Sequence, residues 1–151
     1  MRINLNYFIK SLALFILLGF GSSAYAESSQ EFGDYVIHYN AFRSDTLSPE
    51  MAKAYNLTRR NNRVILNIAV LKKMLNTTGT PTAAEVTGNV NNLTGQMKKL
   101  EFREIKEDTA IYYLAESQFT EGEFLKFEVQ VKPEGSAQAA SIKFDKKFST
   151  K

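Results

Sequence analysis

The stretch Glu123-Phe124-Leu125-Lys126-Phe127-Glu128-Val129-Gln130-Val131-Lys132 alternates apolar and polar side chains from Leu125 onward. Because successive side chains of a β-strand point to opposite faces, this alternation predicts a strand with one buried and one solvated face. Pro133-Glu134-Gly135-Ser136 follows and predicts a turn. The segment is therefore typical of an antiparallel sheet that packs one face on a core.

Six further segments show a strand pattern. They comprise residues 32–42, 64–71, 84–93, 97–105, 109–119 and 140–148. The run Val64–Leu71 is the most apolar and predicts a central strand, Gly88 marks a candidate bulge, and the neighbours Tyr112 and Tyr113 must point to opposite faces. Short polar turns separate these segments and no strand–helix–strand alternation occurs. The sequence therefore predicts an all-β, antiparallel β-sandwich of about seven strands.

One short helix interrupts the strand pattern. Ser48-Pro49-Glu50 combines an N-cap serine, a proline at the first helical position and an acid in the first turn. Met51, Ala54 and Tyr55 fall on one side of this helix, and Asn56 is a plausible end. We expect the helix to cover one end of the core.

Residues 1–26 have the order of a secretory signal peptide. A basic stretch with Arg2 and Lys10 precedes the apolar run Leu12–Phe20, and Ala24 and Ala26 supply the small residues for cleavage between Ala26 and Glu27. The apolar run is about half the ~20 residues that a transmembrane helix needs. We expect a signal peptide over residues 1–26 and a single domain over residues 27–151, in the periplasm or secreted, without a membrane anchor after cleavage.

Composition narrows the function further. The 151 residues include no cysteine, so neither disulfides nor a lipid-modified cysteine can form. Loss of the signal peptide would remove two basic residues and no acid, which lowers the net charge from +3 to +1. A nearly neutral domain has no general attraction to nucleic acid or to an anionic membrane.

Three segments resemble one known family. They are Phe32-Gly33-Asp34-Tyr35 with His38-Tyr39-Asn40-Ala41-Phe42, then Pro49-Glu50-Met51-Ala52-Lys53-Ala54-Tyr55, then Arg63-Val64-Ile65-Leu66-Asn67-Ile68-Ala69-Val70-Leu71. In these residues the chain resembles a group of Gram-negative exported proteins known as domain of unknown function 4426. The resemblance covers most of residues 27–151 and implies a periplasmic, immunoglobulin-like β-sandwich. It implies no activity, because the family has no established chemistry.

No catalytic, metal or cofactor motif is present in the sequence. His38 is the only histidine, and a metal site needs further nitrogen or sulfur ligands. A Ser-His-Asp set with Asp34 is formally available, but the Gly-x-Ser-x-Gly turn that exposes a nucleophile is missing. The carboxylate pairs Glu121/Glu123 and Glu107/Asp108 fall at expected hairpin turns, where solvated charge is the simpler interpretation. We therefore predict no enzyme activity and no cofactor.

Candidate binding residues are few. They are the cluster Arg59, Arg60 and Arg63, whose guanidinium groups suit a carboxylate or phosphate, and the strand residues Tyr35, His38 and Tyr39. The alternatives stay open: a solvated loop in which Arg63 pairs with an acid on the next strand, and a half-buried histidine without a function. The alternating charges of Lys98–Glu104 indicate a protected edge strand, or a strand to which a partner adds its own.

These observations predict a non-enzymatic interaction domain or accessory protein of the cell envelope, with an unknown envelope protein as its partner. The first alternative is a small-ligand binder that holds an anionic group, such as a carboxylate, with the Arg59–Arg63 loop. A hydrolase is a distant third.

Overall fold

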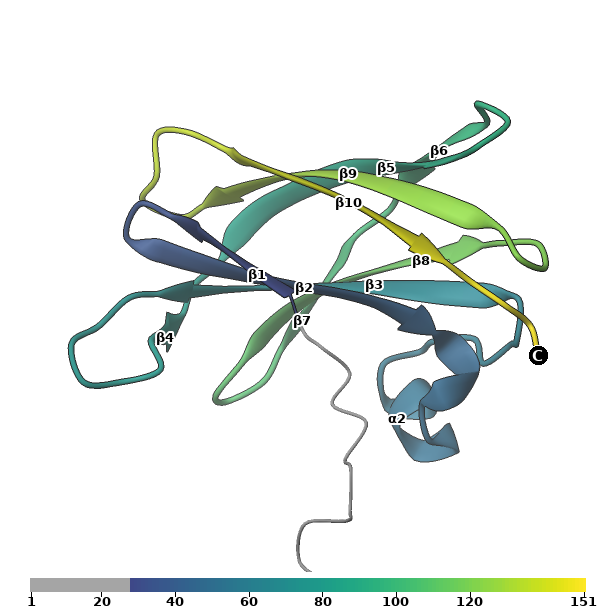
Figure 1. The fold of residues 1–151 in the computed structure, drawn as a ribbon. Coiled ribbons are helices and arrows are strands. Elements are labelled where there is room, and N and C mark those ends of the chain that lie inside the picture. The colour runs from purple at the N-terminus through teal and green to yellow at the C-terminus, as the bar shows by residue number, and fades with distance from the viewer. Residues whose placement is uncertain (1–27) are drawn as a thin grey trace, which may run out of the picture.

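The computed structural model describes residues 28–151, which form two antiparallel sheets that face each other (Figure 1). Sheet A has the strand order β1-β2-β3-β8-β7, with β4 beside β3, and sheet B has the order β10-β9-β5-β6. The strands are β1 (Ser28–Phe32), β2 (Tyr35–Arg43), β3 (Arg63–Lys72), β4 (Thr80–Pro81), β5 (Ala84–Asn92), β6 (Met97–Leu100), β7 (Arg103–Lys106), β8 (Ile111–Gln118), β9 (Phe124–Pro133) and β10 (Ala140–Lys147). The predicted immunoglobulin-like, all-β sandwich is confirmed.

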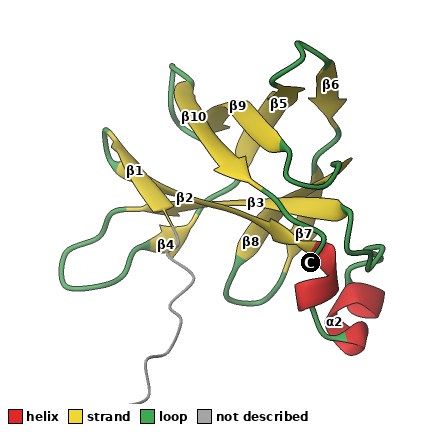
Figure 2. Cartoon of the chain, turned by 45° about the vertical axis from the view of Figure 1, so that its right-hand side comes forward, coloured by secondary structure: helices red, strands yellow, loops and turns green. Residues whose placement is uncertain are grey.

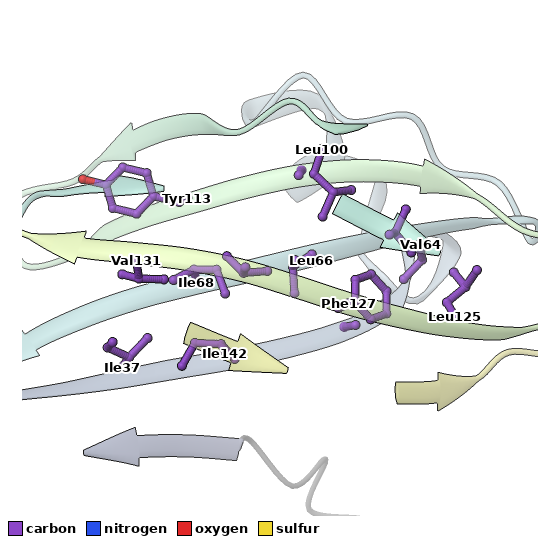
Figure 3. Packing of buried hydrophobic residues seen from close by; sticks show 14 of the residues in the cluster. Ile37, Val64, Leu66, Ile68, Leu100, Tyr113, Leu125, Phe127, Val131 and Ile142 are labelled. Carbon is purple, nitrogen blue, oxygen red and sulfur yellow. The ribbon is translucent and has the colours of Figure 1, made fainter. Parts of the chain in front are cut away.

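The core lies between the two sheets and is built from the alternating side chains of their strands. In β9, Leu125, Phe127, Val129 and Val131 point inward, and each is at most 3% exposed. They pack against residues such as Ile37, Leu66 and Ile68 of sheet A (Figure 3). The alternation of Glu123–Lys132 therefore did identify a strand with one buried face.

The described part of the chain, residues 28–151, has ten strands in place of about seven. Residues 28–30 lie outside the expected strands but belong to β1, which pairs with β2 through the turn at Gly33 (φ 56°). β1 forms one edge of sheet A, so its outward side chains remain in water and need not be apolar. The expected single strand at 97–105 is two strands, because the chain leaves sheet B after Leu100 and enters sheet A at Arg103.

Gly88 is not at a bulge. The register of β5 continues on both sides, with Gly88 opposite Leu100 of β6 and opposite Val129 of β9. A glycine is needed there because a Cβ would lie 2.7 Å from the carbonyl oxygen of Glu128. Close approach of two backbones, not an extra residue, explains this glycine.

The short helix α2 (Pro49–Ala54) begins as predicted. Ser48 Oγ accepts a hydrogen bond from the amide of Met51 at 3.2 Å, and the chain leaves the helix through Asn56 (φ 51°). The expectation that α2 covers an end of the core is wrong, because α2 lies on the outer side of sheet A (Figure 2). There Ala52 belongs to a hydrophobic cluster with Leu57 and Ile65, separate from the main core. β3 carries large apolar residues on both faces, so its outer face also needs cover. Within residues 28–151, no helix has the length and apolar character to cross a membrane.

Candidate functional site

The two outer faces of the sandwich differ in chemistry. The outer face of sheet B is charged along β9 and β10, where Lys126 and Glu128 are exposed and Lys143 lies 3.9 Å from Glu128. The outer face of sheet A is largely apolar, and a second hydrophobic cluster including Ile65 and Leu114 lies there, outside the main core. Two surface hollows with mainly apolar lining lie on this face of sheet A.

We call the first hollow the α2 groove. It has a volume of about 220 Å³. Its lining comprises Phe42, Leu47, Met51, Tyr55, Leu57, Ile65, Asn67, Tyr112 and Leu114. Ile65 and Leu114 are buried and form its floor, whereas Met51 is 47% exposed at its rim. Ala52 of α2 belongs to the same hydrophobic cluster as these two floor residues, so the helix forms one side of the groove.

A second hollow, which we call the His38 hollow, lies farther along the same face. It measures about 260 Å³ and is lined by His38, Ala69, Leu71, Pro81, Thr109, Ala110, Ile111 and Tyr112. Tyr112 lines both hollows. Ile65 and Asn67 of β3 line the first and Ala69 and Leu71 the second, an offset of four residues or roughly 13 Å along a strand. The two hollows thus form a row on either side of Tyr112.

A contact between distant segments fixes one wall of the α2 groove. The hydroxyl of Tyr55 donates a hydrogen bond to Glu107 of the β7–β8 turn. This bond to a carboxylate, helped by partial burial, raises the pKa of Tyr55 above its ordinary value. The bond connects the end of α2 to the hairpin on the other side of the groove.

Asn67 places a polar group in this apolar surface. Its Oδ1 is buried and has no hydrogen-bond partner within the described residues. Asn40 of β2 stands directly opposite Asn67 in the sheet. A buried acceptor without a partner costs about 1–3 kcal/mol, so the amide of Asn67 lowers the stability of the folded protein.

The structure separates the three strand candidates. Tyr35 points into the core, where its hydroxyl donates to the carbonyl oxygen of Glu134 at 2.9 Å. Tyr39 also faces inward, with its ring 5.0 Å from the ring of Phe144. His38 lies on the opposite face of β2 and lines the hollow named after it. Of these three candidates, only His38 lines either hollow of the outer face.

The arginine cluster is also divided. Arg63 pairs with Glu116 of the neighbouring strand β8 at 2.6 Å, which confirms the alternative of pairing across the sheet. Arg59 donates to the carbonyl oxygens of Leu47 at 2.7 Å and Asp45 at 3.0 Å. Arg60 is exposed, and its main chain bonds to Ser44 Oγ. Arg59 is therefore the member of the cluster that reaches the rim of the α2 groove, through Leu47.

Arg103 is a charged residue beside this groove, next to the lining residue Leu114, that the sequence analysis placed only in an expected edge strand. It stands opposite Leu114 in the register of β7 and β8, and it donates to the carbonyl oxygen of Asn56 at 3.2 Å. The segment Lys98–Glu104 was expected to form one edge strand, and the structure divides it between two, β6 and β7, which are edges of the two sheets. The contact of Arg103 with the loop after α2 could not be predicted, because no local sequence signal connects that loop to β7.

The acids do not form a paired site. Glu121 accepts hydrogen bonds from the hydroxyl of Ser149 and from Thr150, and these bonds lower the pKa of Glu121 to about 2. Glu123 accepts from the Thr120 amide at 2.7 Å. Both acids thus stabilise the turn between β8 and β9 and the chain end beside it. Nowhere in residues 28–151 do three His, Cys, Asp or Glu side chains gather in a way that could hold a metal ion.

Comparison with known proteins gives a family and a fold. Residues 29–150 match the family model described as "Domain of unknown function (DUF4426)". A crystal structure of a DUF4426 family protein from Pseudomonas aeruginosa PAO1 is 36% identical, covers 82% of this chain and 94% of its own, and has a TM-score of 0.70. None of the curated proteins matched.

Two crystal structures of FetP from uropathogenic Escherichia coli strain F11 share the fold at 11% identity. One is the as-isolated protein expressed recombinantly in the periplasm (TM-score 0.59, 82% of this chain and 94% of that chain). The other is a copper-bound variant (TM-score 0.58, 82% and 95%).

Proposed function

This chain belongs to the DUF4426 family, a family without an assigned function, and from that premise we propose that it is an exported, non-enzymatic interaction domain. Its binding surface is the outer face of sheet A, and its partner is a protein of the cell envelope. The leader-like order of residues 1–26, which lie outside the described residues, supports export.

One observation carries this proposal: two neighbouring apolar hollows occupy one outer face of the sandwich, whereas the other outer face is charged. Apolar surface that remains open to water on a folded domain marks a place where something docks. Each hollow is smaller than the ~300 Å³ at which small-molecule pockets begin. A row of two small hollows therefore suits side chains of a protein segment better than one compact molecule.

Site-specific cross-linking tests the proposal. A photo-reactive amino acid replaces Met51 at the rim of the α2 groove, and in a control protein it replaces Lys126 on the outer face of sheet B. We expect a protein adduct of defined mass from position 51 only, and its loss when Tyr112→Glu places a charge between the two hollows. Equal adducts from both positions, or none from position 51, would contradict the proposal.

A second candidate function is binding of a small anionic ligand. Arg59 at the rim of the α2 groove supports it, because a guanidinium group suits a carboxylate. Native mass spectrometry of protein taken from the envelope distinguishes the two functions. A bound small molecule that Tyr112→Glu releases would favour the ligand, whereas its absence together with the position-51 adduct would favour the protein partner.

A further inference from the structure

We propose that the α2 groove binds an extended protein segment that carries apolar side chains next to an acidic one, with the carboxylate meeting Arg59 and Arg103. This inference rests on the proposed function and names the chemistry of the partner. It makes Arg59 and Arg103 the residues that determine specificity.

Arg59 supplies the first positive charge. Its side chain is held by two main-chain carbonyl oxygens, those of Leu47 and Asp45, and Leu47 lines the groove. The carboxylate of Asp45 is engaged elsewhere, since Arg43 pairs with it at 2.6 Å. Carbonyl oxygens position the guanidinium group without neutralising it. Arg59 is therefore a fixed charge at the rim.

Arg103 supplies the second charge, from the strand on the other side. It lies opposite Leu114 of the groove floor, and its bond to the Asn56 carbonyl again leaves the charge uncompensated. Glu116, two residues after Leu114 on β8, already pairs with Arg63. No ion pair of Arg59 or Arg103 occurs within residues 28–151.

The acids near the groove compensate the two arginines unequally. Asp45 and Glu50 lie close enough to Arg59 for its charge to lower the pKa of both carboxyls, and Glu107, which accepts a hydrogen bond from the hydroxyl of Tyr55, keeps its negative charge. Arg103, beside Leu114 of the apolar floor, is therefore the less compensated of the two positive charges. A partner that complements both features carries a carboxylate beside apolar side chains, because arginine binds carboxylates through paired N–H groups.

The shape of the surface favours an extended segment. The two hollows lie roughly 13 Å apart along β3, which is the spacing of side chains four residues apart in an extended chain.

Selection from a random peptide library provides the test. The bait is the protein purified in the form that the exporting cell produces, and recovered peptides are kept only if they block the position-51 cross-link. We expect them to be enriched in Asp or Glu beside Leu, Ile, Val or Phe. Arg103→Glu should weaken their binding about tenfold or more, and Lys126→Glu, the same charge change on sheet B, should leave binding within about twofold.

The outcomes separate the two proposals. Blocking peptides without acidic residues, or equal losses from Arg103→Glu and Lys126→Glu, would overturn the inference and leave the binding face intact. If no peptide competes with the cross-link, the inference fails, and the proposed function still stands on the position-51 adduct. Because Arg59 also holds Leu47 and Asp45 in place, Arg59→Glu can unfold the loop, so Arg103 on an exposed strand is the decisive position and Arg59→Lys the milder variant.

Discussion

Gly88 shows how closely the strands of sheet B approach each other. It lies in the middle of β5, between β6 and β9, in an uninterrupted register. A Cβ built at this position would lie 2.7 Å from the carbonyl oxygen of Glu128 and 3.1 Å from the Cα of Val129. Both are backbone atoms, which cannot rotate away as the end of a side chain can.

Replacement of Gly88 by alanine tests this close approach. The added methyl group must push β5 and β9 apart, so we expect Gly88→Ala to lower the free energy of unfolding by about 1–3 kcal/mol. Urea denaturation measures the change. Thr87→Ala, at the exposed neighbouring position on β5, serves as the matched control and should cost less than about 1 kcal/mol. An alanine variant as stable as the wild type would show that the strands adapt.

Single residues also show what a sequence can reveal about a site. Alternation places Tyr112 and Tyr113 on opposite faces, and indeed Tyr113 is buried in the core while Tyr112 lines both outer hollows. The pairing of Arg63 with an acid on the next strand follows from strand adjacency in the same way. The bond between Tyr55 and Glu107 joins residues 52 positions apart through the topology, so no local pattern predicts it.

At the scale of elements, α2 is held by few interactions. A six-residue helix is not stable on its own. The Ser48 cap and the packing of Ala52 against the outer face of sheet A keep it in place, and Arg59 holds the preceding loop at Leu47. Because α2 supplies Met51 to the groove, whatever loosens the helix also changes the groove.

Removal of the cap should loosen α2. Ser48→Ala leaves the amide of Met51 without its acceptor, so we expect a loss of about 1 kcal/mol in stability. The protection of the Met51 amide against hydrogen exchange should fall with it. Ser48→Asp, which restores an acceptor at the cap, should retain both values. Unchanged exchange in Ser48→Ala would mean that packing alone holds the helix.

Strand patterns predict which residues form strands, but they do not predict the sheet to which each strand belongs. In the segment 97–105, Leu100 and Phe102 are both inward and two residues apart, so the alternation continues through the crossing from sheet B to sheet A. A period of two is the same before and after such a crossing. β1 escapes prediction for another reason: an edge strand keeps its polar side chains in water and needs no apolar face.

For the whole molecule, the sandwich is predictable because strands such as β9 alternate apolar and polar side chains, and because the apolar run of β3 marks a strand that is covered on both faces. The candidate site is not, because α2, the loop after it and the β7–β8 hairpin meet over the outside of sheet A. Of the six sequence candidates, only His38 lines one of the two hollows, and Arg59 reaches the rim of the other through Leu47. The sequence marks them as polar or charged residues in a suitable pattern, but only the topology brings Arg103 to the same groove.

Tyr113 connects the two sheets and makes their association depend on pH. From β8 of sheet A, its hydroxyl accepts a hydrogen bond from the amide of Ala84 at the start of β5 in sheet B, and it donates one to Glu104. Burial is the main cause that raises the pKa of Tyr113 to about 12 from its ordinary value of 10.0, and the bond to Glu104 adds to it, against a lowering by the Ala84 amide.

The sign of the pH effect follows from this shift. Above pH 10 the unfolded chain releases the Tyr113 proton while the folded protein still holds it, so the contribution of Tyr113 to stability is complete below pH 10 and is lost as the pH rises from about 10 through 12.

Tyr113→Phe removes the ionisable group but leaves the Ala84 amide without its acceptor, at a cost of about 1–3 kcal/mol at neutral pH. Urea unfolding at pH values from 7 to 12 should therefore show a wild type that is more stable at pH 7, with the difference narrowing above pH 10. A constant difference across this range would contradict the raised pKa, because subtraction of the two profiles removes the titrations that both proteins share.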